Sequence, residues 1–269
     1  MTEGCLNLVF AGMKFMKQKK NAMPAVFRKT ACVVLAIQGC SVFAGPVAEN
    51  FDWGAGVPGR EIFTAGRSID GVPARSGGAV FQDSGKDKSV FSGASGSGRG
   101  VLRMKGAQNA VGFVYPVSGI TVIKVEGRFY PGDTEKGLRG FWVGVQSAAP
   151  DKSLLNNQAT DHIAVQLNAG GAAICRSVVG GVTNTASGDK GLLKFAPGDP
   201  VKIEMTVNMA EGTADVKVTG AGKDNVKIKT LKWTSGKLPD FGMIMINQTG
   251  NGELLLDSVE VSTGPIILG

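Results

Sequence analysis

Short apolar segments with a period of two, separated by turn residues, dominate the chain after residue 100. The clearest is Val201–Val207, which reads Val-Lys-Ile-Glu-Met-Thr-Val, so that alternate side chains are apolar. This period is that of a β-strand with one buried face. Breaks such as Pro131-Gly132-Asp133 favour tight turns. The segments predicted as strands are 101–105, 110–115, 120–130, 141–147, 162–168, 172–178, 201–208, 214–219, 226–233, 241–247 and 253–261.

These segments predict an all-β domain. After residue 44, no window of a dozen residues carries a clean helical stripe of apolar side chains. Short strands at regular spacing with turns between them are typical of an antiparallel sandwich or barrel. The 40 glycines and 11 prolines of the 269 residues agree, because they suit many tight turns better than long helices.

The first 44 residues differ from the rest and predict a signal peptide. A basic stretch, residues 14–29, precedes the short apolar run Thr30–Ile37 and then small residues, which is the three-part pattern of a secretory signal. The apolar run is far shorter than the ~20 residues that span a bilayer. We therefore divide the chain into a signal segment, 1–44, and a single domain, 45–269. Export to the periplasm, the cell surface or the extracellular space is expected, with no transmembrane helix in the mature chain.

Two processing routes fit this segment. Cleavage after Val42-Phe43-Ala44 satisfies the small-residue rule for a signal peptidase. Alternatively, Ile37-Gln38-Gly39-Cys40 resembles a bacterial lipoprotein box, with Gln38 as its departure from the pattern. In that case Cys40 would carry lipid and anchor the domain to a membrane of the bacterial envelope.

Charge and cysteine content exclude some classes of partner and of metal site. Six of the 29 basic residues but one of the 22 acidic residues lie in residues 1–44, so the remaining chain carries about +2 instead of +7. A near-neutral domain lacks the basic surface that nucleic-acid binding requires. Cys175 is the sole cysteine after residue 44, so neither an internal disulfide nor a thiolate metal cluster is expected.

The two ends of the predicted domain resemble a known fold. The opening Glu49-Asn50-Phe51-Asp52, the rhythm of eleven strands and the closing segment 254–261 are similar to the concanavalin A-like jelly roll of lectins, laminin-G-like domains and glucanases. The resemblance covers about residues 49–263. It implies a sandwich of two curved antiparallel sheets, one of them concave and often used to bind sugar chains. Some members hold a structural calcium ion between the first and last strands, for which Asp52 and Asp257 would be the candidates; no other cofactor is expected.

Signatures of catalysis are missing from the sequence. The enzymes of that superfamily carry a Glu-x-Asp-x-x-Glu or Glu-x-Asp-x-Glu strand, which this chain lacks. In the nearest grouping, Glu253, Asp257 and Glu260, the spacing is wrong, and a period of two places Glu260 on the opposite face from the other two. The only histidine, His162, belongs to no nucleophile signature. The sequence therefore leans against an enzyme.

Alternation also predicts a ligand-binding face. If the segments 120–130, 141–147 and 162–168 share a sheet, one face presents an aromatic ring beside planar hydrogen-bonding groups, which suits a polyhydroxylated ligand. The residues of this expected face are Glu126, Arg128, Trp142, Gln146, His162 and Gln166.

The leading hypothesis is an exported, non-catalytic module that binds a polysaccharide, another glycan or another cell-envelope component. One alternative is an atypical polysaccharide hydrolase or lyase with a site around Glu126, Arg128, Tyr130 and His162. A second is a structural envelope protein without a small ligand.

Overall fold

The computed structural model describes residues 45–54, 56–93, 100–106, 108–131, 140–147, 161–168, 172–187, 193–233 and 240–264. All of these lie in one compact unit, Phe43–Gly269. They form the strands β1 (Val47–Glu49), β2 (Phe81–Asp83), β3 (Val90–Gly93), β4 (Gly100–Lys105), β5 (Gln108–Val114), β6 (Ile120–Tyr130), β7 (Gly140–Ser147), β8 (His162–Asn168), β9 (Ala173–Val179), β10 (Val182–Ser187), β11 (Asp199–Asn208), β12 (Thr213–Gly220), β13 (Lys223–Lys232), β14 (Phe241–Thr249) and β15 (Glu253–Gly264).

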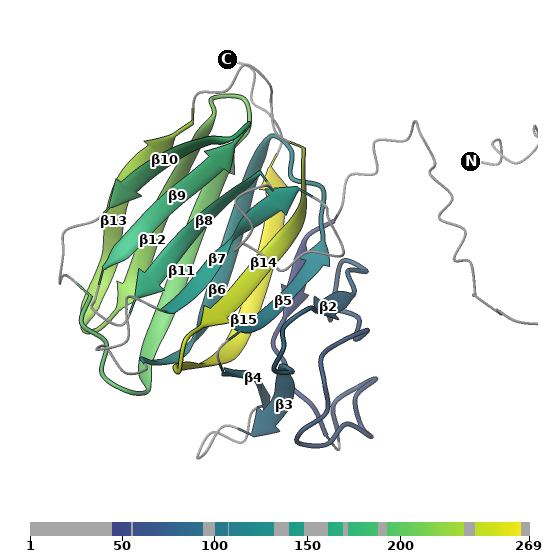
Figure 1. Ribbon diagram of the computed structural model, residues 1–269. Helices are drawn as coiled ribbons and strands as arrows, with labels where there is room; N and C mark the ends of the chain where they lie inside the picture. The colour runs from purple at the N-terminus through teal and green to yellow at the C-terminus, as the bar shows by residue number, and fades with distance from the viewer. Residues whose placement is uncertain are drawn as a thin grey trace, which may run out of the picture. The chain divides into compact units, whose positions relative to one another are not determined.

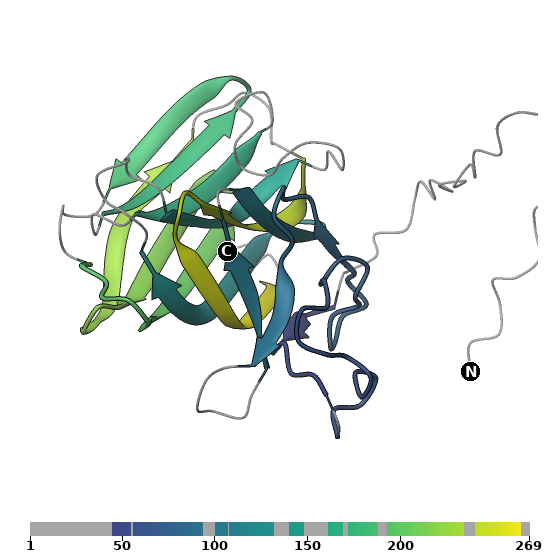
Figure 2. The ribbon, with the colours of Figure 1, turned by 60° about the horizontal axis from the view of Figure 1, so that its bottom comes forward.

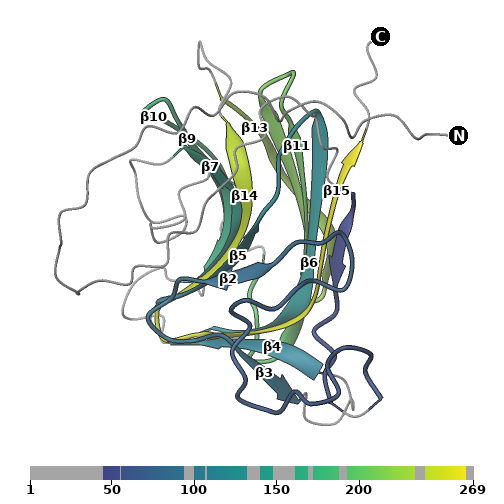
Figure 3. The same ribbon diagram turned by 90° about the vertical axis from the view of Figure 1, so that its right-hand side faces the viewer.

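The strands build two antiparallel sheets (Figure 1). The eight-stranded sheet has the order β13-β12-β11-β6-β15-β4-β3, and β1 pairs with β15. The seven-stranded sheet has the order β10-β9-β8-β7-β14-β5-β2. Figure 3 views both edge-on, with β9, β7 and β14 in one layer and β11, β6 and β15 in the other; the outer face of the seven-stranded sheet is its concave side. The predicted all-β, two-sheet sandwich is confirmed.

The core between the sheets follows from the period of two. In β6, every second residue from Thr121 to Phe129 is buried, and the residues between them are partly exposed. The ring of Phe129 meets the ring of Phe141 from the opposite sheet at a centroid distance of 5.0 Å. Such contacts between the inner faces exclude water and supply most of the stability of a sandwich. The inner residues predicted for β7 and β8 are likewise buried: Phe141, Val143, Val145, Ile163, Val165 and Leu167.

The region before residue 94 is fixed by a buried ion pair as well as by short strands. Arg60 donates two hydrogen bonds to Glu49, at 2.7 Å to Oε1 and 2.6 Å to Oε2. The Glu49 carboxylate also accepts from the backbone N–H groups of Phe51 and Arg75. Figure 2 shows the described segment before residue 94 as purple to dark blue loops along one edge of the sandwich. The strand segments predicted from alternation did not include β1, β2 or β3.

A β-bulge in β15 corrects the prediction for Glu260. Pairing with β6 shifts register between Leu256 and Ser258, so one extra residue is inserted at that point. Glu253 then pairs with Tyr130 and Glu260 with Lys124, both at outward positions of β6. The prediction that Glu260 faces away from Glu253 was wrong, because strict alternation does not hold across a bulge.

Candidate functional site

The expected ligand face is divided between the two sheets. β6, with Glu126 and Arg128, belongs to the eight-stranded sheet, whereas β7 and β8 belong to the seven-stranded sheet. Both β6 residues alternate with inner-face residues and so lie on the outer face of their own sheet, on the other side of the sandwich. The prediction of a single face that includes Glu126 and Arg128 was therefore wrong. For the same reason, Glu126 and His162 cannot form one catalytic site.

The other expected residues do share one face. Trp142 is paired with Gln166, and Gln146 is paired with His162, across β7 and β8. Each alternates with buried core residues, so all four lie on the outer face of the seven-stranded sheet.

Strand pairing adds three residues that the sequence analysis did not place there. Asn247 of β14 lies opposite Trp142, Ile174 of β9 lies opposite Gln166, and Arg176 of β9 lies opposite Ala164.

This outer face has a covered part and an accessible part. Gln146 and His162 are each 2% exposed, so in this structure neither contacts solvent appreciably. Trp142, Gln166, Ile174 and Arg176 remain partly exposed. We call these four residues the Trp142 face. A ligand from solvent has access to the Trp142 face, whereas Gln146 and His162 lie beneath the surface.

Trp142 is held by apolar contacts on the outer side of the sheet. It packs against a small buried cluster that is separate from the main core and consists of Ala110, Ala164, Met243 and Met245. The cluster needs the small residues of β7 and β8, because a Cβ atom on Gly144 would collide with the carbonyl oxygen of Ile163 and the side chain of Ala164. The indole is thus positioned by packing before any ligand arrives.

Around the Trp142 face, the described outward residues of the seven-stranded sheet include no carboxylate. At the described outward positions of β5, β14, β7, β8, β9 and β10, the polar residues are amides, hydroxyls, His162 and Arg176. An indole can stack on the apolar face of a sugar ring, and an amide such as that of Gln166 can both donate to and accept from hydroxyl groups.

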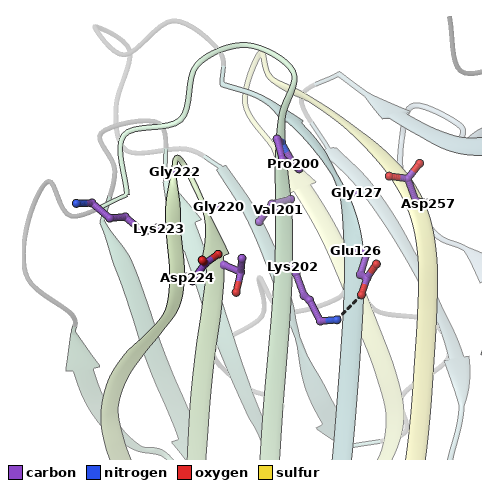
Figure 4. Close-up of a pocket in the computed structure, with 11 residues that line it drawn as sticks. Glu126, Gly127, Pro200, Val201, Lys202, Gly220, Gly222, Lys223, Asp224 and Asp257 are labelled. Carbon is purple, nitrogen blue, oxygen red and sulfur yellow. Dashed lines mark ion pairs between the residues drawn. The ribbon is translucent and has the colours of Figure 1, made fainter. Parts of the chain in front are cut away.

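The outer face of the eight-stranded sheet is built differently, because it carries ion pairs between neighbouring strands. Lys202 contacts Glu126 at 2.6 Å and Lys217 contacts Glu204 at 3.0 Å. The hydrogen bond and charge of Glu126 raise the pKa of Lys202, and the hydrogen bond from Lys217 lowers the pKa of Glu204. Figure 4 shows Glu126 and Lys202 pointing toward each other over a pocket of about 270 Å³. The carboxylate of Glu126 therefore forms an ion pair with Lys202.

The two calcium candidates line one pocket of about 570 Å³ on this face, beside Glu126 and Arg128. One oxygen of Asp52 already accepts from Asn50 Nδ2 at 2.7 Å, and the other accepts from the N–H of Gly100 at 3.2 Å. Calcium takes six to eight oxygen ligands. Within the described residues, no group of three or more His, Cys, Asp or Glu side chains is arranged to hold a metal ion. A calcium ion held by Asp52 and Asp257 therefore stays a prediction.

The remaining predicted features concern cysteines and the membrane. Cys40 and the rest of the segment 1–44 lie outside the described residues. Cys175 is buried on the inner side of β9, and burial raises the pKa of its thiol to about 12. None of the described residues belongs to a helix that is long and apolar enough to cross a membrane.

Comparisons with known proteins give similarity of fold alone. No family model matches the sequence, and no curated protein matches it either. Lectin I from Ulex europaeus, in complex with the methyl glycoside of α-L-fucose, matches 80% of this chain and 97% of its own, with 9% identity and a TM-score of 0.49. Lectin I-B4 from Griffonia simplicifolia matches 69% of this chain and 93% of its own, with 11% identity and a TM-score of 0.48.

The exoplasmic/lumenal domain of VIP36, in a Ca²⁺- and mannose-bound form, matches 74% of this chain and 91% of its own, with 9% identity and a TM-score of 0.48. These proteins have the concanavalin A-like lectin fold.

Proposed function

We propose that this chain is an exported, non-catalytic β-sandwich module that binds carbohydrate on the Trp142 face. The observation that carries the proposal is the partly exposed Trp142 beside Gln166, held on an apolar cluster outside the main core. A ring fixed by packing loses little conformational freedom when a ligand stacks on it. The adjacent amide supplies the hydrogen bonds that sugar hydroxyls require.

The position of the Trp142 face also favours binding over hydrolysis by paired carboxylates. A retaining or inverting glycosidase needs two carboxyl groups on either side of the scissile bond. The described outward residues of the seven-stranded sheet include none. Among the described carboxylates on the outer face of the other sheet, Glu126, Glu204 and Glu253 are each in an ion pair.

A binding screen with a matched aromatic control tests the proposal. A glycan array and a reducing-sugar release assay are run on the purified protein and on Trp142→Ala and Tyr130→Ala. Tyr130 is a partly exposed aromatic residue on the outer face of β6, so its loss controls for removal of an exposed ring. Binding without sugar release, lost in Trp142→Ala and kept in Tyr130→Ala, is expected.

Other outcomes would replace the proposal. Release of reducing sugar would support a hydrolase, and silence in both assays would support a structural protein. If Trp142→Ala bound as well as the unaltered protein, the Trp142 face would not be the site. Thermal melts of both variants show whether each is folded.

Export is the second part of the proposal, and it rests on the basic and apolar pattern of residues 14–44. The intact mass of the protein recovered from a secreting bacterial host distinguishes the two routes. A chain that begins at Gly45 supports signal-peptide cleavage, and a chain that begins at Cys40 with added lipid mass supports anchoring. Recovery of the uncleaved chain in the cytoplasm would contradict export.

A further inference from the structure

We infer that the ligand of the Trp142 face is an acidic polysaccharide, and that Arg176 pairs with its anionic group. The inference rests on the proposed function and adds the charge class of the ligand and the residue that selects it.

The charge distribution over the two outer faces gives the first reason. On the eight-stranded sheet, two lysines pair with glutamates on neighbouring strands, Lys202 with Glu126 and Lys217 with Glu204. On the described outer face of the seven-stranded sheet, Arg176 has no carboxylate beside it at the paired positions, which are Ala164 and Thr185. Among the described residues, neither position paired with Arg176 supplies a carboxylate to neutralise it, and an anionic ligand would complement its charge.

The hydrogen bonding of Arg176 gives the second reason. Its Nε atom is buried and has no hydrogen-bond partner among the described residues. Arg60 and Arg103, in contrast, donate to the carboxylates of Glu49 and Glu253. A guanidinium presents a planar fork of donors that matches a carboxylate, and it binds sulfate as an oxyanion as well. Arg176 as a whole residue is partly exposed, so an anionic ligand can approach its guanidinium from solvent and supply an acceptor there.

The positions of Trp142 and Arg176 fit a polymer better than a single sugar. From Trp142 the register runs across β8 at Gln166 to Ile174 on β9, and Arg176 lies two residues further along β9. Strand and residue spacings place the two Cα atoms about 12 Å apart. A ligand that stacks on the indole and reaches the guanidinium therefore extends over more than one ring.

The test uses two pairs of polymers that differ in charge alone. Polygalacturonate is compared with its methyl ester, and dextran sulfate with dextran, by isothermal titration at low and moderate salt. The variants are Arg176→Gln, which removes the charge, and Arg128→Gln. Arg128 is a partly exposed arginine on the outer face of the other sheet, so its loss changes net charge equally.

The inference predicts that the protein binds one acidic polymer at least roughly tenfold more tightly than its neutral partner. Arg176→Gln should abolish this preference, whereas Arg128→Gln should keep it. Preference within the galacturonate pair identifies a carboxylate as the recognised group, and preference within the dextran pair identifies a sulfate.

Equal affinity for charged and neutral polymers, or a preference that survives in Arg176→Gln, would overturn the inference. If the protein bound these polymers without a preference for charge and Trp142→Ala abolished the binding, the proposed function would stand without the inference about Arg176. Absence of binding to all four polymers would overturn the inference for these two acidic classes, and the glycan array then decides the proposed function separately.

Discussion

The ion pair between Glu49 and Arg60 offers a stability prediction with a magnitude set by the structure. The Glu49 side chain is 0% exposed and that of Arg60 is 4% exposed, so neither charge is screened by water. Replacing Glu49 by Gln leaves a buried guanidinium without its counter-charge. Breaking a buried pair in this way costs about 3–5 kcal/mol. Arg60 also donates to the carbonyl oxygen of Pro73 at 2.9 Å, which compensates only in part.

Glu253→Gln is the matched control. Glu253 also pairs with an arginine, Arg103, at 2.8 Å, but these side chains are 21% and 40% exposed. An exposed pair contributes about 0–1 kcal/mol. The free energy of unfolding from urea titrations at pH 7 should therefore fall by about 3–5 kcal/mol in Glu49→Gln and by less than about 1 kcal/mol in Glu253→Gln.

A double variant checks the physical reason. Glu49→Met combined with Arg60→Met removes both charges, and it should be more stable than Glu49→Gln, because no unpaired charge stays buried. If Glu49→Gln and Glu253→Gln lost similar stability, burial would not be what makes the first pair important.

Two further predictions concern titratable groups. Because burial raises the pKa of Cys175 to about 12, iodoacetamide at pH 8 should alkylate it only after denaturation; peptide mass spectrometry checks this, and rapid labelling in the native protein would contradict it. Burial also raises the pKa of Asp83 above its usual 3.8, against the lowering effect of hydrogen bonds from Ser89 and Gly85. Its stabilising contribution is therefore fully present below pH 3.8 and is lost as the pH rises through the folded-state pKa. The stability of the unaltered protein relative to Asp83→Asn should fall as the pH rises above 3.8 in urea titrations, and a rise would refute the assignment.

Local patterns in the sequence predicted eleven of the fifteen described strands, and they missed β1, β2, β3 and β10. The alternation in β6, β7 and β8 placed Phe129, Val143 and Val165 in the core correctly, because the period of two depends on neighbours along the chain. Sheet membership depends on pairing between distant segments. β6 pairs with β11 and β15, whose midpoints follow that of β6 by about 80 and 130 residues, and no local pattern reports that choice.

The same limit explains the outcome for the candidate site. Trp142 and Gln166 were brought together correctly because β7 and β8 are consecutive neighbours in one sheet. Glu126 and Arg128 were misplaced because β6 joined the other sheet. Arg176 was missed, although its segment was predicted as a strand. Its position on the same face as Ile174, two residues away, could have been inferred from alternation. The burial of His162 depends on the folded chain and had no signal in the sequence.

The central claim is that a carbohydrate binds on the Trp142 face, and the structure of a complex tests it most directly. A crystal structure with the best ligand from the array should show a sugar ring in van der Waals contact with the Trp142 indole, within about 4.5 Å. It should also show ligand oxygens within hydrogen-bond distance of Gln166. A ligand bound instead over the paired charges of the eight-stranded sheet, with the Trp142 indole uncontacted, would contradict the account.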